Sequence, residues 1–293
     1  MPPEVTAIVT TNARPAHVQE AIASLRAETH ESVELVVVDD GCGFTAPSGL
    51  PLRVVQGVDL GVGRARNLGL AAAQGEFVLF LDDDDVALPH RIATLVSAAR
   101  RHQAEVCFGR TRRVLDQERR AGSPAGPASI SGRLESRPYV FDGPSQGLPD
   151  VPTHLPSSQR VAFADLLTCA PHINAVLART ETLRAVGGFD AEARHFDDWS
   201  AWLRLADRGA VIWSVPETVA EWRIHQLGLS GKVLGDRAMK TRVLSLFDRL
   251  EPSLSNTNAR AVAAAREIVK LADIATYDDY ADAMAAARPE LRV

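Results

Sequence analysis

The first hundred residues alternate between short apolar segments and longer segments with helical spacing. Strands are predicted by the apolar segments 5–9, 35–38, 52–56 and 77–81, and helices by the spacing of apolar residues over 15–27, 63–74 and 89–101. Strands that alternate with helices are typical of a parallel sheet covered on both faces. We therefore expect an α/β fold with a mostly parallel central sheet and helices on both of its faces.

The alternation stops after the first third of the chain. Between Arg110 and about Ser158 the sequence is rich in Pro, Gly and Ser, and a loop of that length is usually functional or disordered. We interpret it as a mobile segment near an acceptor site. Periodic segments return at Phe163, with a strand predicted at 211–214. Ordered segments are expected at 173–177 and 180–186, and helices are predicted at 199–208, 237–250, 258–275 and 277–287.

The apolar strand at 77–81 runs directly into four aspartates, Asp82 to Asp85. Two carboxylates about 4 Å apart repel each other by about 4 kcal/mol at the effective dielectric of a protein surface. Ligands of open α/β sheets bind at the carboxyl ends of strands, so a divalent metal carrying a phosphate would suit this cluster. An acidic turn before a helix starting at Pro89 is an equally good explanation from these residues alone.

Two further motifs fall at the same predicted edge of the sheet. Asp39-Asp40-Gly41 follows the strand 35–38, and Asp-Gly is also common in a simple turn that ends a strand. Gly61 and Gly63 precede a predicted helix, where backbone N–H groups can face an anion. Arg66, with its neighbour Arg64, adds positive charge at the unfavourable end of that helix, which indicates an anionic partner.

The composition is that of an ordinary globular protein. The 293 residues are 46% hydrophobic and 24% charged, with a net charge of −5, which argues against a nucleic-acid partner. Three separated cysteines support neither a zinc ribbon nor a disulfide framework. No apolar run reaches the length of a transmembrane segment and no signal sequence begins the chain, so we expect a cytoplasmic protein.

Taken in order, the motifs carry a family resemblance. They are Val5 to Thr10, Val36-Val-Val-Asp39-Asp40-Gly41, Gly61-x-Gly-x-Ala-Arg66-Asn67-x-Gly69, Gly75 to Asp85, Val186-Gly-Gly-Phe-Asp190, Phe196-Asp197-Asp198-Trp199 and Trp222-Arg223-Ile-His225. This order resembles family 2 glycosyltransferases with the GT-A fold, over roughly residues 4–230. The resemblance implies a catalytic domain at 1–230 and a C-terminal helical extension at 231–293.

Within the catalytic domain, the resemblance implies a donor half at 1–109, a flexible loop region at 110–160 and an acceptor half at 161–230. The extension at 231–293 has no motif, so capping, a homodimer through its helices, and partner binding all remain open.

The resemblance also implies roles in binding a nucleotide-diphosphate sugar. Residues expected to contact the donor nucleotide or sugar are Thr10, Asp40, Arg66, Asp82 and Asp83. Asp84 is the expected ligand of Mn²⁺ or Mg²⁺ in the DxD motif, and His225 is expected near the metal. UDP is the first choice of nucleotide. Because the aromatic residue usual after the first strand is missing at Thr11-Asn12-Ala13, dTDP and GDP remain as alternatives.

Asp198 corresponds to the family's catalytic base, which would deprotonate an acceptor hydroxyl for inversion by a single displacement. Burial beside Trp199 would raise the pKa of this carboxyl and make it a better base. Asp197 is expected to cap the helix that follows. Together with Asp197, candidates for the acceptor side are His172, Asn174 and Trp199.

Two other functions fit parts of the pattern. A sugar-phosphate nucleotidylyltransferase would share the fold. Such enzymes have a loop rich in glycine and basic residues after the first strand, which residues 10–15 do not resemble. A degenerate domain that only binds a sugar nucleotide or a partner is a non-enzymatic alternative. The presence of both the Asp82 cluster and Asp198 favours the enzyme.

Overall fold

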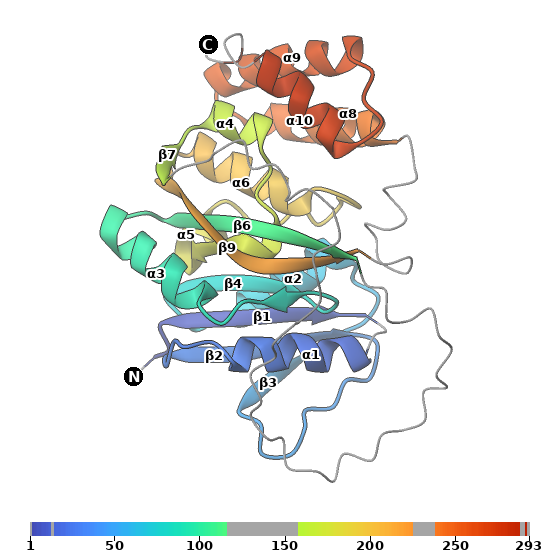
Figure 1. Cartoon of the computed structure of the whole chain (residues 1–293). Coiled ribbons are helices and arrows are strands. Elements are labelled where there is room, and N and C mark those ends of the chain that lie inside the picture. The colour runs from blue at the N-terminus through green and yellow to red at the C-terminus, as the bar shows by residue number, and fades with distance from the viewer. Residues whose placement is uncertain (1, 13–14, 116–157, 225–237, 288–290, 292–293) are drawn as a thin grey trace.

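The structure, a computed structural model, describes residues 2–12, 15–115, 158–224, 238–287 and 291. It consists of one sheet with helices on both faces and a group of helices at the C-terminal end (Figure 1). The strands are β1 (Val5–Thr11), β2 (Val33–Asp40), β3 (Leu52–Gly57), β4 (Phe77–Asp82), β5 (Val86–Ala87), β6 (Val106–Leu115), β7 (Gln159–Val161), β8 (Val176–Arg179) and β9 (Ile212–Ile224).

The helices follow the expected positions closely. They are α1 (Pro15–Arg26), α2 (Val62–Ala72), α3 (Arg91–His102), α4 (Phe163–Thr168), α5 (Thr180–Ala185), α6 (Asp197–Asp207), α8 (Met239–Leu250), α9 (Asn256–Leu271) and α10 (Tyr277–Ala286), with short 3-10 turns η2 (Ile173–Ala175) and η3 (Glu251–Ser253). Apolar spacing predicts seven helices, and all seven are present in the described residues, as α1, α2, α3, α6, α8, α9 and α10.

The first half of the sheet is parallel. Its strand order is β3-β2-β1-β4, and Thr10 of β1 pairs with Val38 on one side and with Asp82 on the other. The carboxyl ends of β2 and β4 therefore reach the same edge, one strand apart. All residues of β4 from Phe77 to Leu81 are buried, which confirms the expected central strand.

The second half of the sheet is mixed. β8 lies antiparallel between β4 and β6, and β6 is parallel to the long strand β9. The loop expected from Arg110 is wrong at its start, because β6 continues to Leu115 and pairs with β9, with Arg113 opposite Trp222. This pairing satisfies the backbone hydrogen bonds of residues whose composition suggested a loop. The rest of that expected loop, 116–157, lies outside the described residues.

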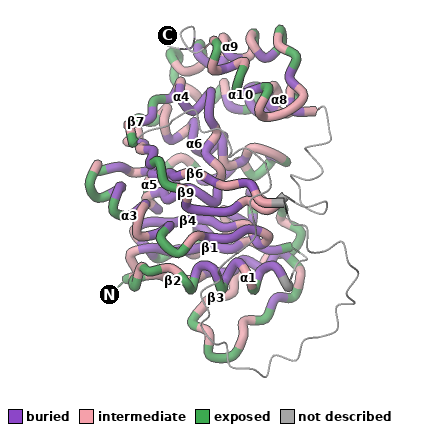
Figure 2. Tube along the Cα trace, in the orientation of Figure 1, coloured by how far each residue is buried: buried purple, intermediate pink, exposed green. Residues whose placement is uncertain are grey.

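Alternate side chains of each strand pack into two cores. Ile8 lies in the core under α2 and α6, whereas Ala7 and Val9 lie in the core under α1 and α3. Figure 2 shows this buried interior running through the strands. The expectation of helices on both faces is confirmed, and the period-two alternation of a half-buried strand explains it.

The C-terminal helices share one of these cores. Apolar side chains of α8, α9 and α10 belong to the same cluster as Trp199 of α6. Tyr277 accepts a hydrogen bond from the backbone N–H of Ala170 at 2.8 Å, and the hydroxyl of Tyr280 donates to the carbonyl of Leu167. In the described part of the chain, the helices α8, α9 and α10 thus share one core with α6.

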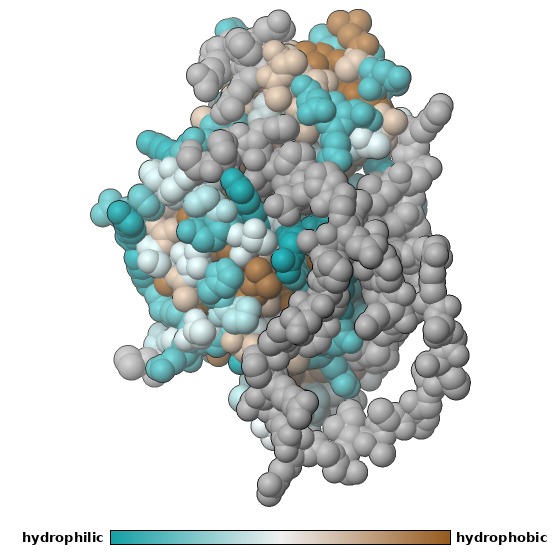
Figure 3. Space-filling model, in the orientation of Figure 1, coloured by the Kyte–Doolittle hydropathy of each residue, from teal (hydrophilic) through white to brown (hydrophobic). Residues whose placement is uncertain are grey.

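Two large apolar residues remain exposed among those described, Val58 and, at the end of α9, Leu271, which is 87% exposed. Figure 3 shows apolar atoms over the C-terminal helices at the top of the face in view. The homodimer expected through these helices stays a prediction. None of the helices that the structure describes combines the length and the apolar character needed to cross a bilayer.

Candidate active site

The four aspartates after β4 do not point in one direction. Asp83 is buried, and its carboxylate accepts a hydrogen bond from the hydroxyl of Thr11 at 2.7 Å. The backbone N–H of Asp85 donates to the carbonyl of Asp82 at 3.1 Å, which closes a turn. The turn brings Asp82 and Asp85 back to the same side. We call residues Asp82 to Asp85 the acidic turn.

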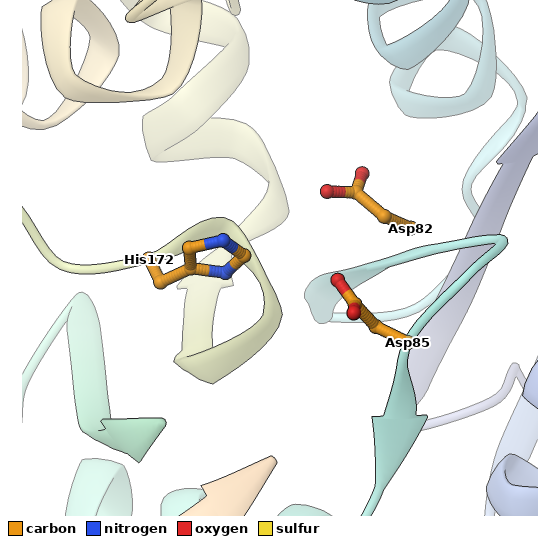
Figure 4. A group of neighbouring side chains, drawn as sticks. All are labelled: Asp82, Asp85 and His172. Atoms are coloured by element: carbon orange, nitrogen blue, oxygen red, sulfur yellow. The ribbon is translucent and has the colours of Figure 1, made fainter. Parts of the chain in front are cut away.

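Asp82, Asp85 and His172 form the group that could hold a metal ion among the described residues. One ligand atom of each lies within 4.8 Å of the others, and the three side chains approach from two sides of the site (Figure 4). Sequence reasoning favoured Asp84 as the metal ligand, left open which of Asp82 to Asp85 ligate the ion, and missed the metal-side position of His172. The closure of the turn decides which carboxylates meet, and the sequence carries no sign of it. Asp84 as a ligand stays a prediction.

The carboxylates of the acidic turn repel one another. Burial raises the pKa of Asp85 well above its usual range, and the charges of Asp84 and Asp82 raise it further. Burial also lowers the pKa of His172 to about 4, so its ring is neutral near pH 7. Clustered carboxylates of this kind fit Mg²⁺ or Mn²⁺, which prefer oxygen ligands and would offset the repulsion. The acidic turn therefore fits a divalent cation.

His172 adds a hydrogen-bonding group rather than charge. Its Nδ1 accepts from the backbone N–H of Asn174 at 3.3 Å. In a neutral imidazole this leaves the proton on Nε2, so the ring offers an N–H to the site, and ligation of a metal through Nε2 would require the other tautomer. The histidine expected near the metal, His225, lies outside the described residues.

Arg66 connects the two halves of the site. It is 6% exposed, and it donates to Asp82 at 2.7 Å and to Asp197 at 2.8 Å. Although burial disfavours the charge, Asp197 and then Asp82 raise the pKa of Arg66 above its ordinary value. The anionic partner expected for Arg66 is thus present as two carboxylates, and Arg64 pairs in turn with Glu192 at 2.5 Å.

Two of the residues expected to contact the donor, Thr10 and Asp40, lie at the ends of β1 and β2. Asp40 accepts hydrogen bonds from the backbone N–H groups of Leu60 at 2.8 Å and Gly61 at 3.1 Å. It therefore holds the glycine loop beside the end of β1, where Thr10 is half-buried. The nucleobase and donor roles of Thr10, Asp40, Arg66, Asp82 and Asp83 stay predictions.

The glycines of this loop serve packing as well. A Cβ on Gly63 would lie 2.5 Å from the carbonyl oxygen of Asp190. Asn67, one helical turn later, accepts from the N–H of Phe189 at 2.8 Å and donates to its carbonyl at 2.9 Å. The turn at 187–190 docks here, so two of the recognised motifs bind each other.

Asp197 and Asp198 begin helix α6. The expectation that Asp197 caps this helix is wrong, because the N-cap is Phe196, at φ 64°, and the Asp197 carboxylate binds Arg66 instead. Asp198 accepts from the backbone N–H of Trp199 at 2.8 Å. Burial, and next the charge of Asp197, raise the pKa of Asp198 to about 7, against the opposing effect of Arg66. The expected rise of this pKa is present.

Of the remaining acceptor-side candidates, Trp199 lines the site but is 1% exposed, with its indole N–H donating to the carbonyl of Leu166 at 2.8 Å. Most of its surface therefore serves the core. Asn174 is fully buried, and its side chain binds the acidic turn. It is not among the described residues that line the cavity.

Several of the groups described above line one cavity of about 290 Å³. Its described lining includes Arg66, Asp82, Arg113, His172, Asp198, Trp222, Arg242, Tyr277 and Asp278. The last three come from α8 and α10, for which the sequence offered no motif. Arg113 was also missed: it donates to Asp278 at 3.0 and 3.1 Å and lies over the ring of Trp222, 5.6 Å from its centroid.

Residues 6–152 match the profile of the family described as Glycosyl transferase family 2. The chain belongs to that family. A glycosyltransferase of uncharacterised function from Haemophilus influenzae is 31% identical over 272 residues, which cover 82% of this chain and 90% of the relative. A similar protein from Nostoc sp. is 38% identical over 89 residues, and that match spans 27% of this chain and 28% of the relative.

Solved structures show that this family 2 glycosyltransferase has the GT-A fold. The mannosyltransferase PcManGT from Pyrobaculum calidifontis, in complex with GDP-Man and Mn²⁺, superposes with a TM-score of 0.62 and 17% identity over 99% of this chain and 76% of its own. S. aureus TarS in complex with UDP-GlcNAc gives a TM-score of 0.59 and 15% identity over 98% and 92%. The α/β fold expected from the motifs is confirmed.

Proposed function

We propose that the protein is a metal-dependent inverting glycosyltransferase that moves a sugar from a nucleotide-diphosphate sugar to an acceptor hydroxyl. One observation carries the proposal. Asp198, whose pKa is raised to about 7, lines the same cavity as Asp82 of the acidic turn. A carboxyl that titrates near neutral pH is suited to general base catalysis, and a neighbouring cluster of carboxylates is suited to a cation.

Asp198 is the proposed base. Its other carboxylate oxygen, Oδ2, would accept the hydrogen bond of the acceptor hydroxyl and then take the proton, while Oδ1 stays bound to the N–H of Trp199. The acceptor oxygen forms a bond to the anomeric carbon as the bond from that carbon to the diphosphate oxygen breaks. The nucleoside diphosphate leaves with the electron pair, and a single displacement inverts the anomeric configuration.

The acidic turn is the proposed site for Mn²⁺ or Mg²⁺. A divalent cation there would stabilise the negative charge that develops on the leaving diphosphate. His172 supports this assignment with a neutral ring whose Nε2–H can donate to a phosphate oxygen. Arg66 holds the turn against Asp197, beside the base.

UDP is the proposed donor nucleotide, with GDP and dTDP as alternatives. S. aureus TarS binds UDP-GlcNAc and PcManGT binds GDP-Man, so proteins of this fold accept either base. Asp40, Thr10 and the amide of Asn12, which lies 3.5 Å from Asp40, form the edge where the nucleobase would bind. The acceptor would enter between Asp198 and the C-terminal helices that line the cavity.

The test is a panel of UDP-, GDP- and dTDP-sugars with Mn²⁺, in which release of nucleoside diphosphate and the anomeric configuration of the product are followed by NMR. Asp198→Asn should keep donor binding and lower turnover by about 10²- to 10⁴-fold, because the amide cannot take a proton. Full turnover by Asp198→Asn would refute the base, and retention of configuration would refute the single displacement. Transfer that survives EDTA would refute the metal requirement.

A further inference from the structure

Asn174 is a fully buried polar residue behind the acidic turn. It lies in the 3-10 turn η2, which leads into β8 and packs against the end of β4. It lies 92 positions after Asp82 in the chain. Its side chain has no exposed surface, so its hydrogen bonds to the protein determine what it does.

The side-chain amide binds both ends of the acidic turn. Its carbonyl oxygen accepts from the backbone N–H of Asp82 at 2.9 Å, and its NH₂ group donates to the carboxylate of Asp85. A backbone N–H requires an acceptor and a carboxylate requires a donor, so only one orientation of the amide satisfies both neighbours. One neutral side chain thus fixes the separation between the first and last residues of the turn.

The backbone of the same residue binds the third member of the group. The N–H of Asn174 donates to Nδ1 of His172 at 3.3 Å. Asn174 therefore contacts Asp82, Asp85 and His172, the three residues whose ligand atoms lie within 4.8 Å of one another.

An amide suits this position better than the alternatives. The other oxygen of Asp85 accepts from the backbone N–H of Arg223 at 2.7 Å, so both donors to this carboxylate are neutral. An arginine or lysine in place of Asn174 would cancel the charge that attracts a cation. An apolar side chain would take one partner from the buried carboxylate of Asp85 and another from the part-buried N–H of Asp82, which is costly. The amide holds the turn and preserves its negative charge.

We propose that Asn174 is a positioning residue for divalent-cation binding, which clamps the acidic turn so that its carboxylates converge on one ion. This inference rests on the proposed function, because it assumes a cation at the acidic turn. It assigns Asn174 a different role from the acceptor contact expected from the sequence. It holds whichever carboxylates of the turn ligate the ion, since the clamp fixes both ends.

The test measures Mn²⁺ affinity rather than activity. Mn²⁺ is titrated into the wild-type protein alone and with excess UDP, GDP or dTDP, and free Mn²⁺ is followed by EPR. The condition of tightest binding is then used for the variants. Asn174→Leu, which is close in size, should weaken Mn²⁺ binding by about 10- to 100-fold, the usual effect of losing a partner that orients metal ligands. Asn174→Ala is measured in the same way in case leucine prevents folding.

Asn258→Leu is the matched control. Its amide donates to Asp207 at 2.9 Å, in the contact between α9 and the end of α6. This variant loses an amide-to-carboxylate bond too, but it should leave Mn²⁺ affinity unchanged. Circular dichroism melting curves place every titration below the melting temperature, so a loss of fold cannot mimic a loss of affinity.

Two results would overturn the inference, and only one of them would also overturn the proposed function. Mn²⁺ affinity in folded Asn174→Leu or Asn174→Ala equal to that of the wild type overturns the positioning role and leaves the proposed function intact. Absence of Mn²⁺ binding to the wild type under every condition overturns the metal-dependent function and this inference with it.

Discussion

Arg66 of α2 donates a hydrogen bond to Asp197 of α6 at 2.8 Å, between residues 131 positions apart in the chain. The same buried guanidinium binds Asp82 at the end of β4. Asp197 is the neighbour of the proposed base, so one side chain sets the charge around the base and around the acidic turn. A substitution at the acidic turn should therefore change the electrostatic environment of the proposed base, and a substitution beside the base should change that of the turn.

Arg66→Met should destabilise the protein and alter its pH dependence. It leaves Asp82 and Asp197 without their positive partner, and removal of one member of a buried ion pair lowers the free energy of unfolding by about 3 to 5 kcal/mol. The pKa of Asp198 should rise, because Arg66 lowers it. Urea unfolding and a pH profile of turnover measure the two effects. Arg66→Lys keeps the charge and should shift the profile less; equal shifts would contradict a charge effect.

The rate of transfer should depend on the ionisation of Asp198. Since its pKa is about 7, kcat/KM should rise as the pH increases through about 7 and then level off, because only the ionised carboxylate accepts a proton. The profile is measured with saturating Mn²⁺ between about pH 5 and pH 9. A flat profile across neutral pH would argue against Asp198 as the base.

The same pKa has a consequence for stability. Asp198 has an ordinary pKa of 3.8 and a folded-state pKa of about 7, so between these values the folded protein holds a proton that the unfolded chain has lost. Its contribution to stability is therefore full below about pH 4 and is lost as the pH rises through about 7. Asp198→Asn should remove this part of the decline, which chemical denaturation at a series of pH values would show.

The ion pair of Arg113 and Asp278 should join the C-terminal helices to the sheet. The Arg113 side chain is 7% exposed and that of Asp278 is 45% exposed, so Asp278→Ala leaves a buried guanidinium without its carboxylate. We expect the free energy of unfolding to fall by about 1 to 3 kcal/mol. Donor affinity should be unchanged, whereas KM for the acceptor should rise because both residues line the cavity.

Two comparisons sharpen this prediction. A double-mutant cycle with Arg113→Met should give a smaller combined loss than the sum of the single losses. Glu267→Ala breaks an exposed pair with Lys270 of the same helix, and it should change stability by at most about 1 kcal/mol. A loss at Asp278 no larger than that at Glu267 would mean that the C-terminal helices do not depend on this pair.

Gly63→Ala should destabilise the protein by disturbing the contact between helix α2 and the turn at 187–190. The new Cβ would lie 2.5 Å from the carbonyl oxygen of Asp190, which is backbone and cannot rotate away. Overpacking of this kind costs about 1 to 3 kcal/mol. Ala71→Ser, at an exposed position of the same helix, should stay within about 0.5 kcal/mol. Thermal melting of the two variants tests this, and similar melting temperatures would contradict it.

The sequence by itself located most of the helices, the parallel strands of the first hundred residues, and the edge of the sheet where the proposed site lies. Apolar periodicity located β4 and α6 within one or two residues, and it also separated the two faces of the sheet, because burial imposes that period on each element. Motifs at the ends of β2 and β4 placed Asp40 and Asp82 on one edge, since parallel strands end together. The family followed from the order of those motifs.

Only the tertiary structure decided which side chains meet. The partnership of Arg66 with Asp197, the clamp by Asn174 and the contribution of Asp278 to the cavity join positions far apart in the chain. Local periodicity records whether a residue is buried but not which residue lies opposite. The closure of the acidic turn likewise placed Asp85 beside Asp82, because four identical side chains carry no pattern that could distinguish them.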